Sequence, residues 1–469
     1  MEASLSYISK IIEKIQSVQY VEARYHSRRS NEVRICNGEM EELKFTKYSG
    51  VGIRVLFNGA WGFSSSSSLD QESLSTAMND AIAIARVSSS GSRNKISKLG
   101  GANLAHGKFG NYAHDSLDSH SPEEKVKLVK ETERIPRSYS TIIKSAICAY
   151  REIIDEKIIV TSDGAAVEIS DMKPEFRITA VASRNGEAVS ATESVGITGG
   201  WQRLFQRKTP EEMATRAADV AIKLLDAKQP KGERATVVLD PGMVGLISHE
   251  AIGHTVEADF VLSGSIVKDR IGEKVASEIV TLVDSGPSGI RNGIGGGTVL
   301  VDDEGVITQD TVLIEDGVLK SYLHNKETAG LFDVKSTGNA RAFEYTDEPL
   351  IRMRNTYIEP RDYSTSELIR DVKHGYLMKG ARGGQADANA EFMFGAQEAY
   401  VIENGELGPM LRGATISGQA FETLKSVDAV GKDFQFDIGA GYCGKWQMAK
   451  VDGGGPHIRC KAIVGGVVI

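Results

Sequence analysis

Pairs of Asn or Asp followed by Gly recur along the sequence, between runs in which apolar and polar residues alternate. Both members of such a pair tolerate the positive φ angles of a two-residue hairpin turn, so each pair predicts two antiparallel strands joined tightly. The chain contains 49 glycines and 11 prolines, which favours such turns over proline-rich loops. Six of these pairs are Asn37-Gly38, Asn58-Gly59, Asp163-Gly164, Asn185-Gly186, Asp316-Gly317 and Asn404-Gly405. We therefore expect many short strands.

Two helix starts share one design. The segments Ser121–Glu124 and Thr209–Glu212 each supply a hydroxyl cap, a proline at the first helical position and a glutamate at the third, which is a capping box. We expect the first helix to end at Ile135, because Pro136 should stop it. The second should run to about Ala227.

Two stretches of the first half follow the same order. Residues 33–87 and 160–227 each place a turn pair between alternating runs, then a second hairpin, a Gly-Trp neighbourhood and a helix, which in the first stretch should span about Leu69–Val87. This order indicates two related units. We expect residues 1–230 to form an N-terminal α/β domain, with possible units at 1–100 and 120–230, and residues 1–16 to form a short amphipathic helix.

Composition excludes several classes of protein. With a formal net charge of −8, the chain offers no concentrated cationic surface for nucleic acid. No run approaches the ~18 apolar residues of a membrane span, and no charged-then-apolar leader opens the sequence, so we expect a cytoplasmic protein that binds no membrane. Four scattered cysteines do not form a disulfide framework. The glycine clusters match neither nucleotide-binding pattern, and turn glycines explain them.

The stretch "HEAIGHTVEAD" places His249 and His254 five residues apart, with Glu250 directly after the first. A cap and a first-turn proline at Asp240-Pro241 predict a helix that carries all three. Side chains five apart diverge by roughly 140° on an ideal α-helix, so two such histidines could not share one ion. An inserted π-type turn would bring them back to one face, and we expect that distortion at Gly253. Otherwise the two are unrelated helix histidines.

A catalytic zinc site needs three protein ligands and one open position. Cys443 lies in a glycine-flanked turn, "GAGYCGKW", that could present a thiolate, whereas Cys460 alternates with apolar residues in a strand-like run. Glu257 is a rival third ligand, or a partner that orients one of the histidines. Zinc lowers the pKa of a bound water to about 7, and Glu250 would then serve as the general base.

The residues from 231 to 469 otherwise alternate short strand-like runs with glycine. We expect this part to form a β-rich catalytic domain. The predicted fold class is α+β: an N-terminal sheet-and-helix domain with a possible internal repeat, followed by a β-rich C-terminal domain that carries one metal-binding helix.

The sequence resembles the TldD branch of the TldD/PmbA family of zinc metalloproteases. The matching segments are "YSGVGIRVLFNGAWGFSSSSSLD", "HEAIGHTVEAD", "GARGGQADANAEFMFGAQEAYVIENGEL", "LRGATISGQAFETLKSVDAVGKD" and "CGK". The resemblance implies Zn²⁺ held by His249, His254 and Cys443, with Glu250 as the catalytic base. After "CGK", however, His457 and Cys460 add potential ligands.

The resemblance also implies a substrate and a partner. The substrate would be an unfolded peptide that enters as an added strand near the metal, with the glycine-rich edge at Gly380–Gly384 as a candidate contact. The partner would be a second copy of the chain or a PmbA-type subunit. The alternative function is a non-catalytic peptide-binding or structural subunit of the same fold, although a structural site gains nothing from Glu250.

Overall fold

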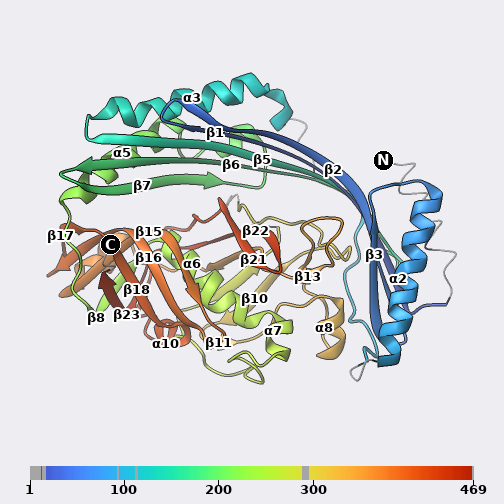
Figure 1. Cartoon of the computed structure of the whole chain (residues 1–469). Coiled ribbons are helices and arrows are strands. Elements are labelled where there is room, and N and C mark those ends of the chain that lie inside the picture. Colours follow the sequence, from blue (N-terminus) through green and yellow to red (C-terminus); the bar gives the residue numbers. More distant parts are fainter. Residues whose placement is uncertain (1–11, 13–16, 92–94, 111–114, 288–294, 467–469) are drawn as a thin grey trace.

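An arched sheet lies over a β-rich second half in the computed structural model of the chain (Figure 1). The structure describes residues 12, 17–91, 95–110, 115–287 and 295–466. The helix predicted for residues 1–16 lies outside this part of the chain, apart from Ile12. None of the described helices combines the length and the apolar composition needed to cross a membrane.

The arched sheet contains every strand of the first half. Its strand order is β3-β2-β1-β5-β6-β4, and β7 pairs with β6 beside β4. Helices α3 and α5 cover the upper face, and α2 packs on β2 and β3 at the far end (Figure 1). The strands are β1 Tyr20–Cys36, β2 Glu39–Phe57, β3 Ala60–Ser66, β4 His106–Phe109, β5 Ile143–Thr161, β6 Ala166–Arg184 and β7 Glu187–Gly196. The helices are α2 Gln71–Gly91, the 3₁₀ turn η1 Leu117–Ser119, α3 Pro122–Tyr139, α4 Trp201–Leu204 and α5 Pro210–Asp226.

The predicted turns account for the hairpins of this sheet and for others further along the chain. In five of the six pairs both residues have positive φ, as at Asn37 (52°) and Gly38 (86°), which only glycine and small polar residues accept readily. The exception is the pair at residues 163–164, where Gly164 alone has positive φ within a longer loop between β5 and β6. The many expected strands are thus present.

Both capping boxes form, at Ser121 and at Thr209. Helix α5 ends at Asp226, as predicted, but the predicted end of α3 at Ile135 is wrong, since the helix continues through Pro136 to Tyr139. Pro136 lies in the last turn and is buried, so the helix loses one hydrogen bond there while its apolar face still packs against β5 and β1.

In the second half, five strands close on themselves. The order β15-β8-β23-β18-β16 returns from β16 to β15, with β17 and β19 attached outside. We call this the closed sheet; its strands line the largest apolar core. They are β8 Glu233–Leu239, β15 His374–Ala386, β16 Glu391–Glu403, β17 Glu406–Leu411, β18 Ala414–Gln419, β19 Ala429–Val430 and β23 Ile458–Gly466.

A second sheet of this half, the central sheet, has the order β11-β10-β9-β14-β22-β20, and β21 pairs with β22. Cys443 lies in β21 of this sheet. Its strands are β9 Leu282–Ser285, β10 Asp310–Glu315, β11 Val318–Leu319, β14 Asn355–Ile358, β20 Gln435–Phe436, β21 Gly441–Lys445 and β22 Gln447–Gly455, and the separate pair is β12 Ala340–Arg341 with β13 Leu350–Ile351.

The helix predicted near Pro241 is present, but the second half also contains short helices that the sequence did not predict. Each spans five or six residues, too few for an apolar period to be visible. One of them has a capping box at Ser364 and Glu367, a signal that the sequence does contain. The additional helices are α7 Ala258–Leu262, α8 Lys326–Leu331, α9 Thr365–Arg370 and α10 Ala420–Lys425.

The two halves differ in their sheets, because the arched sheet contains only β1 to β7 and the other sheets begin with β8. We propose a domain boundary near Lys231 on this ground, and possible units at 1–100 and 120–230 within the first domain.

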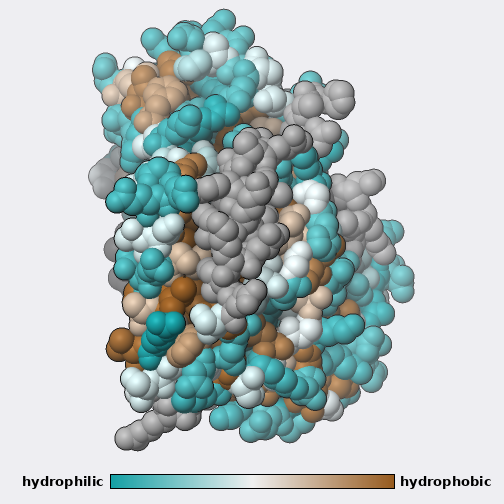
Figure 2. Space-filling view, turned by 90° about the vertical axis from the view of Figure 1, so that its right-hand side faces the viewer, coloured by the Kyte–Doolittle hydropathy of each residue, from teal (hydrophilic) through white to brown (hydrophobic). Residues whose placement is uncertain are grey.

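On the face shown in Figure 2, hydrophobic and hydrophilic residues are interspersed.

Helix α6, Pro241–Leu246, packs directly on strand β22 through two glycines. A Cβ atom on Gly245 would lie 2.5 Å from the backbone carbon of Gly453, closer than any real contact. Because the helix and the strand touch through their backbones, the separation between the helix that leads to the histidines and the strand next to Cys443 is fixed.

Replacing Gly245 with Ala is expected to destabilise the protein by about 1–3 kcal/mol, because helix and strand must move apart. The sign is informative, since Gly to Ala in a helix normally stabilises by up to about 1 kcal/mol. Urea unfolding measures the change, and Gly232→Ala is the control because a Cβ there meets nothing within 4 Å. Equal stability of the two variants would contradict this account of the packing.

Candidate metal centre

The helix that carries the histidines widens where they lie. After α6 the chain continues as a π-helix, η2, over Ile247–Gly253, and then as a 3₁₀ turn, η3, over His254–Val256. The predicted distortion at Gly253 is present as the last residue of a longer π segment. In this wider coil the rings of His249 and His254 lie 5.5 Å apart, measured between centroids, instead of facing away from each other.

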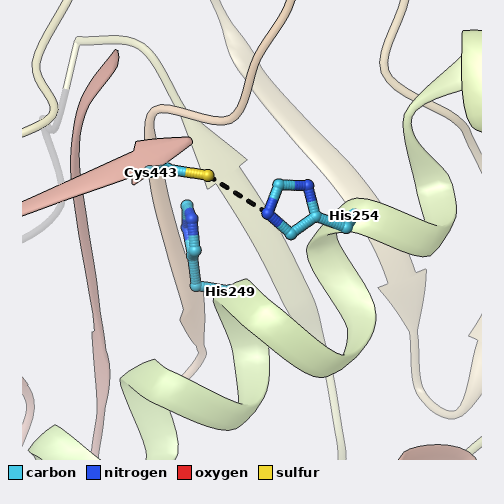
Figure 3. A group of neighbouring side chains, drawn as sticks. All are labelled: His249, His254 and Cys443. Carbon is cyan, nitrogen blue, oxygen red and sulfur yellow. Dashed lines mark hydrogen bonds between the residues drawn. The ribbon is translucent and has the colours of Figure 1, made fainter. Parts of the chain in front are cut away.

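Three ligand atoms converge at this point (Figure 3). His249 comes from the π-helix, His254 from the turn that follows it, and Cys443 from β21, which runs past both. One atom from each residue lies within 4.8 Å of the other two. The Sγ atom of Cys443 is 3.1 Å from Nε2 of His254. Among the described residues, this is the cluster of His, Cys, Asp and Glu side chains able to hold a metal ion.

The surroundings of His249 indicate that the cluster fits a cation. His249 is 1% exposed, and neither of its ring nitrogens has a hydrogen-bond partner. A buried polar group without a partner costs about 1–3 kcal/mol, so such groups are rare unless a ligand completes them. Two imidazoles and a thiolate are ligands that zinc prefers, and three of them leave one position open.

The charges within the cluster also suit a cation. Burial alone would raise the pKa of the Cys443 thiol, but the imidazoles of His249 and His254 lower this pKa to about 5. Burial alone would lower the pKa of His254, but the carboxylate of Glu257 and the neighbouring thiol raise it to about 10. Without metal, the site therefore holds a thiolate that accepts a hydrogen bond from an imidazolium. Binding of a metal ion would release the His254 proton.

Glu257 is placed to orient His254 rather than to join the three ligand atoms. Its Oε2 atom lies 2.9 Å from Nδ1 of His254, on the side of the ring away from Cys443. Glu257 is fully buried, and Nζ of Lys445 lies 3.2 Å from the same oxygen. Burial would raise the pKa of Glu257, but His254, Lys445 and Arg352 together hold it below its usual value. A charged carboxylate thus fixes the ring and its tautomer.

Glu250 lies beside the cluster without belonging to it. Its two carboxylate oxygens are 3.7 Å from Nε2 of His254 and 4.0 Å from Nε2 of His249. The side chain is 31% exposed, whereas His249 next to it is buried. Glu250 therefore faces both the ligand atoms and the solvent, which is the position that a proton acceptor for a water molecule requires.

The other candidate ligands of the sequence lie elsewhere. Cys460 is in the core of the closed sheet, paired with Val237, and burial raises its pKa to about 12. His457 makes an ion pair with Asp433. Neither belongs to the cluster.

Two basic residues support the site and were not predicted from the sequence. Lys445 contacts Glu257 and, through Nζ, lies 2.8 Å from Oδ1 of Asp259. Arg352 is 1% exposed, and its guanidinium donates to the carbonyls of Cys443 and Gln447 at 2.6 and 2.8 Å, which fixes the hairpin that carries the thiol. Because Lys445 follows Cys443 by two residues, its position near the thiol could have been predicted from the sequence. No sequence pattern around Arg352 indicated its role.

The glycine-rich segment Gly380–Gly384 lies in β15, where it pairs with β16. The partner strand β8 pairs with β15 only up to Met378. The amide of Gly380 then donates to Asp240, at 2.9 Å, and Asp240 also caps helix α6. Beyond this point one edge of β15 has no paired strand among the described residues, and the π-helix η2 packs against this strand.

Comparison with known proteins covers nearly the whole chain. Residues 21–85, 115–225 and 232–466 match the models for domain 1, the central domain and the C-terminal domain of PmbA/TldA metallopeptidases. A metalloprotease of Methanocaldococcus jannaschii is 38% identical over 460 residues, which covers 97% of this chain and 98% of the relative. A zinc metalloprotease TldD homolog of Saccharolobus solfataricus is 29% identical over 471 residues, covering 98% of this chain and 100% of the relative.

Solved structures share the fold. TldE from Thermococcus kodakarensis superposes with a TM-score of 0.78 at 19% identity, covering 99% of this chain and 100% of that one. A protein from Thermotoga maritima gives a TM-score of 0.79 at 23% identity, with the same coverage. The predicted combination of an N-terminal sheet-and-helix part and a β-rich C-terminal part is confirmed. With three domain models matched in order and a relative 38% identical over 98% of its length, the chain belongs to the TldD/PmbA family of metallopeptidases.

Proposed function

We propose that the protein is a zinc-dependent peptidase, with His249, His254 and Cys443 as the ligands and Glu250 as the general base. The observation that carries the proposal is the buried His249, whose ring nitrogens lack partners beside a thiol and a second imidazole within 4.8 Å. Two relatives that are named metalloproteases, matched over 98% and 100% of their lengths, support the reaction class. A relative named a zinc metalloprotease supports the choice of metal.

The side chains of the site divide the chemical work. Zinc, when bound, would supply a Lewis acid and a water of lowered pKa. Glu250 would accept a proton from that water and deliver it to the leaving amine, since its carboxylate is both next to the ligands and open to solvent. Glu257 and Lys445 would hold His254 in one tautomer and orientation. Arg352 would hold the hairpin, and with it the thiol, in place.

We propose unfolded or extended peptides as the substrates. An extended chain can add to an unpaired strand edge through main-chain hydrogen bonds, with loose sequence preference. The edge of β15 beyond Met378 supports this mode. We also propose that the protein works in the cytoplasm and forms a dimer with itself or with a PmbA-type subunit. The fold shared with TldE is consistent with a partner of the same family.

The experiment that tests the proposal compares one preparation in three states. Protein loaded with one equivalent of Zn²⁺ should cleave an unfolded reporter peptide; dialysis against a chelator should abolish cleavage, and added Zn²⁺ should restore it. Circular dichroism before and after chelation checks that the fold persists. Binding of the peptide without cleavage in every state would instead support the non-catalytic subunit, and absence of zinc from the native protein would remove the basis of the mechanism.

A further inference from the structure

The turn that joins β21 to β22 consists of a single residue, Trp446. Lys445 and Gln447 on either side of it already pair with each other. The Trp446 side chain is 87% exposed, the highest value among the exposed large hydrophobic residues of the described chain. Tryptophan is normally buried to a large extent, so an indole held in solvent at this position requires an explanation.

The backbone of Trp446 makes the position more unusual. Its φ angle is 56°, in the left-handed region that bulky residues rarely adopt, at a cost of about 1–3 kcal/mol. The flanks hold it there, because Arg352 donates to the carbonyls of Cys443 and Gln447. Lys445 is anchored by Glu257 and Asp259. Such strain persists where the surroundings impose it, and it concentrates at functional sites.

The aromatic neighbour of Trp446, Phe260, lies between Trp446 and the metal centre. The ring of Phe260 lies 6.4 Å from that of Trp446, between centroids, and 6.1 Å from that of His254. Phe260 is partly buried, with Nζ of Lys445 4.3 Å from its centroid. The two rings therefore extend outward from a ligand of the centre as a short aromatic row.

We propose that Trp446 and Phe260 form a subsite for a large apolar side chain of the peptide, within two residues of the scissile bond. The proposal rests on the peptidase function proposed above. Successive residues of an extended peptide are about 3.3 Å apart, so a side chain two positions from the bond lies about 6.6 Å along the chain. This reach matches the 6.1 Å between the rings of His254 and Phe260, and a large side chain placed against Phe260 would extend toward Trp446, whose ring lies 6.4 Å from that of Phe260.

The charges around the aromatic row favour an apolar occupant over an anionic one. The cation beside it, Lys445, makes ion pairs with both Glu257 and Asp259. An anionic substrate side chain would meet the negative faces of the rings, and the lysine beside them is already paired with two carboxylates. An aliphatic or aromatic side chain would instead bury apolar surface against both rings.

The first test measures selectivity on zinc-loaded protein. Peptide pairs that differ only by Phe or Gly, placed in turn at each of the two positions on either side of the cleaved bond, give ratios of kcat/KM. We expect Phe to be favoured by about 10-fold or more at one position, and Trp446→Ala to reduce that ratio to about 2. Val87→Ala, on α2 and 74% exposed, should keep the ratio unchanged. A ratio that Trp446→Ala does not alter would overturn the subsite.

The second test does not depend on cleavage, so the subsite and the peptidase function can fail separately. A Glu250→Gln variant loaded with zinc is titrated with the Phe and Gly peptides while tryptophan fluorescence is recorded. The Phe peptide should shift the emission with at least a several-fold lower Kd, and the shift should disappear in Glu250→Gln with Trp446→Phe. Identical Kd values for both peptides would overturn the subsite. Loss of the dimer on Trp446→Ala, with selectivity preserved, would assign Trp446 to a partner contact instead.

Discussion

Replacing Glu250 with Gln is expected to lower kcat for peptide cleavage by about 10²–10⁴-fold, the usual contribution of a general base. Glutamine has the shape of glutamate but cannot accept a proton in this pH range. Because Glu250 is not one of the three converging ligands, the variant should bind zinc as the parent protein does. The fold should also persist, since the side chain is partly exposed and His254 keeps its contact with the carboxylate of Glu257.

Two measurements on the same samples check this prediction: zinc per chain by elemental analysis and cleavage of the reporter peptide. Glu278→Gln is the matched control, because Glu278 is a highly exposed glutamate. It forms an ion pair with Lys274, four residues before it, and such an exposed pair contributes at most about 1 kcal/mol. Full cleavage by the zinc-bound Glu250→Gln variant would disprove the role assigned to Glu250. Loss of zinc together with activity would mean that Glu250 is a ligand.

Replacing Cys443 with Ser is expected to weaken zinc binding by more than about 100-fold, beyond the effect usual for groups that only orient a ligand. The Cys443 thiol has a pKa of about 5, so at pH 7 it is a thiolate, the form that binds the metal. A serine hydroxyl stays neutral and protonated there. The variant should therefore lose both a ligand atom and a negative charge, and it should be isolated with far less than one zinc per chain.

Cys460→Ala is the matched control for this experiment. Cys460 is as buried as Cys443, but it lies in the core of the closed sheet, so its loss should cost stability and leave zinc binding unchanged. Competition with a chromophoric chelator measures both affinities, and urea unfolding measures both stabilities. If Cys460→Ala lost zinc and Cys443→Ser retained it, the ligand set would be wrong.

Local signals in the sequence predicted most secondary structure of the first half. The capping boxes at Ser121 and Thr209 begin helices, and three of the four turn pairs of this half adopt the expected φ angles. These features depend on interactions between residues at most four apart, which sequence patterns contain. The continuation of α3 through Pro136 was missed because it depends on packing against β5 and β1. The short helices α7 to α10 were missed because their lengths carry no period.

The sequence also predicted the histidine pair and the need for a widened helix. Spacing alone led to that conclusion, because five residues on an α-helix place two side chains on different faces. The residues favoured Cys443 over Cys460 and left Glu257 as a rival ligand, and the family resemblance then implied Cys443. The structure separates the three: Cys443 meets the imidazoles, Glu257 contacts the far side of one ring, and Cys460 lies in a core.

By itself, the sequence determined where turns and helices begin, which residues could bind a metal and which family the chain resembles, since these depend on residue type and short spacing. Only the tertiary structure decided which distant groups meet. Cys443 is 189 residues from His254, and their contact depends on α6 lying against β22 and on Arg352 holding the hairpin. Close packing sets such contacts by shape across the whole domain, so no local pattern of residues records them.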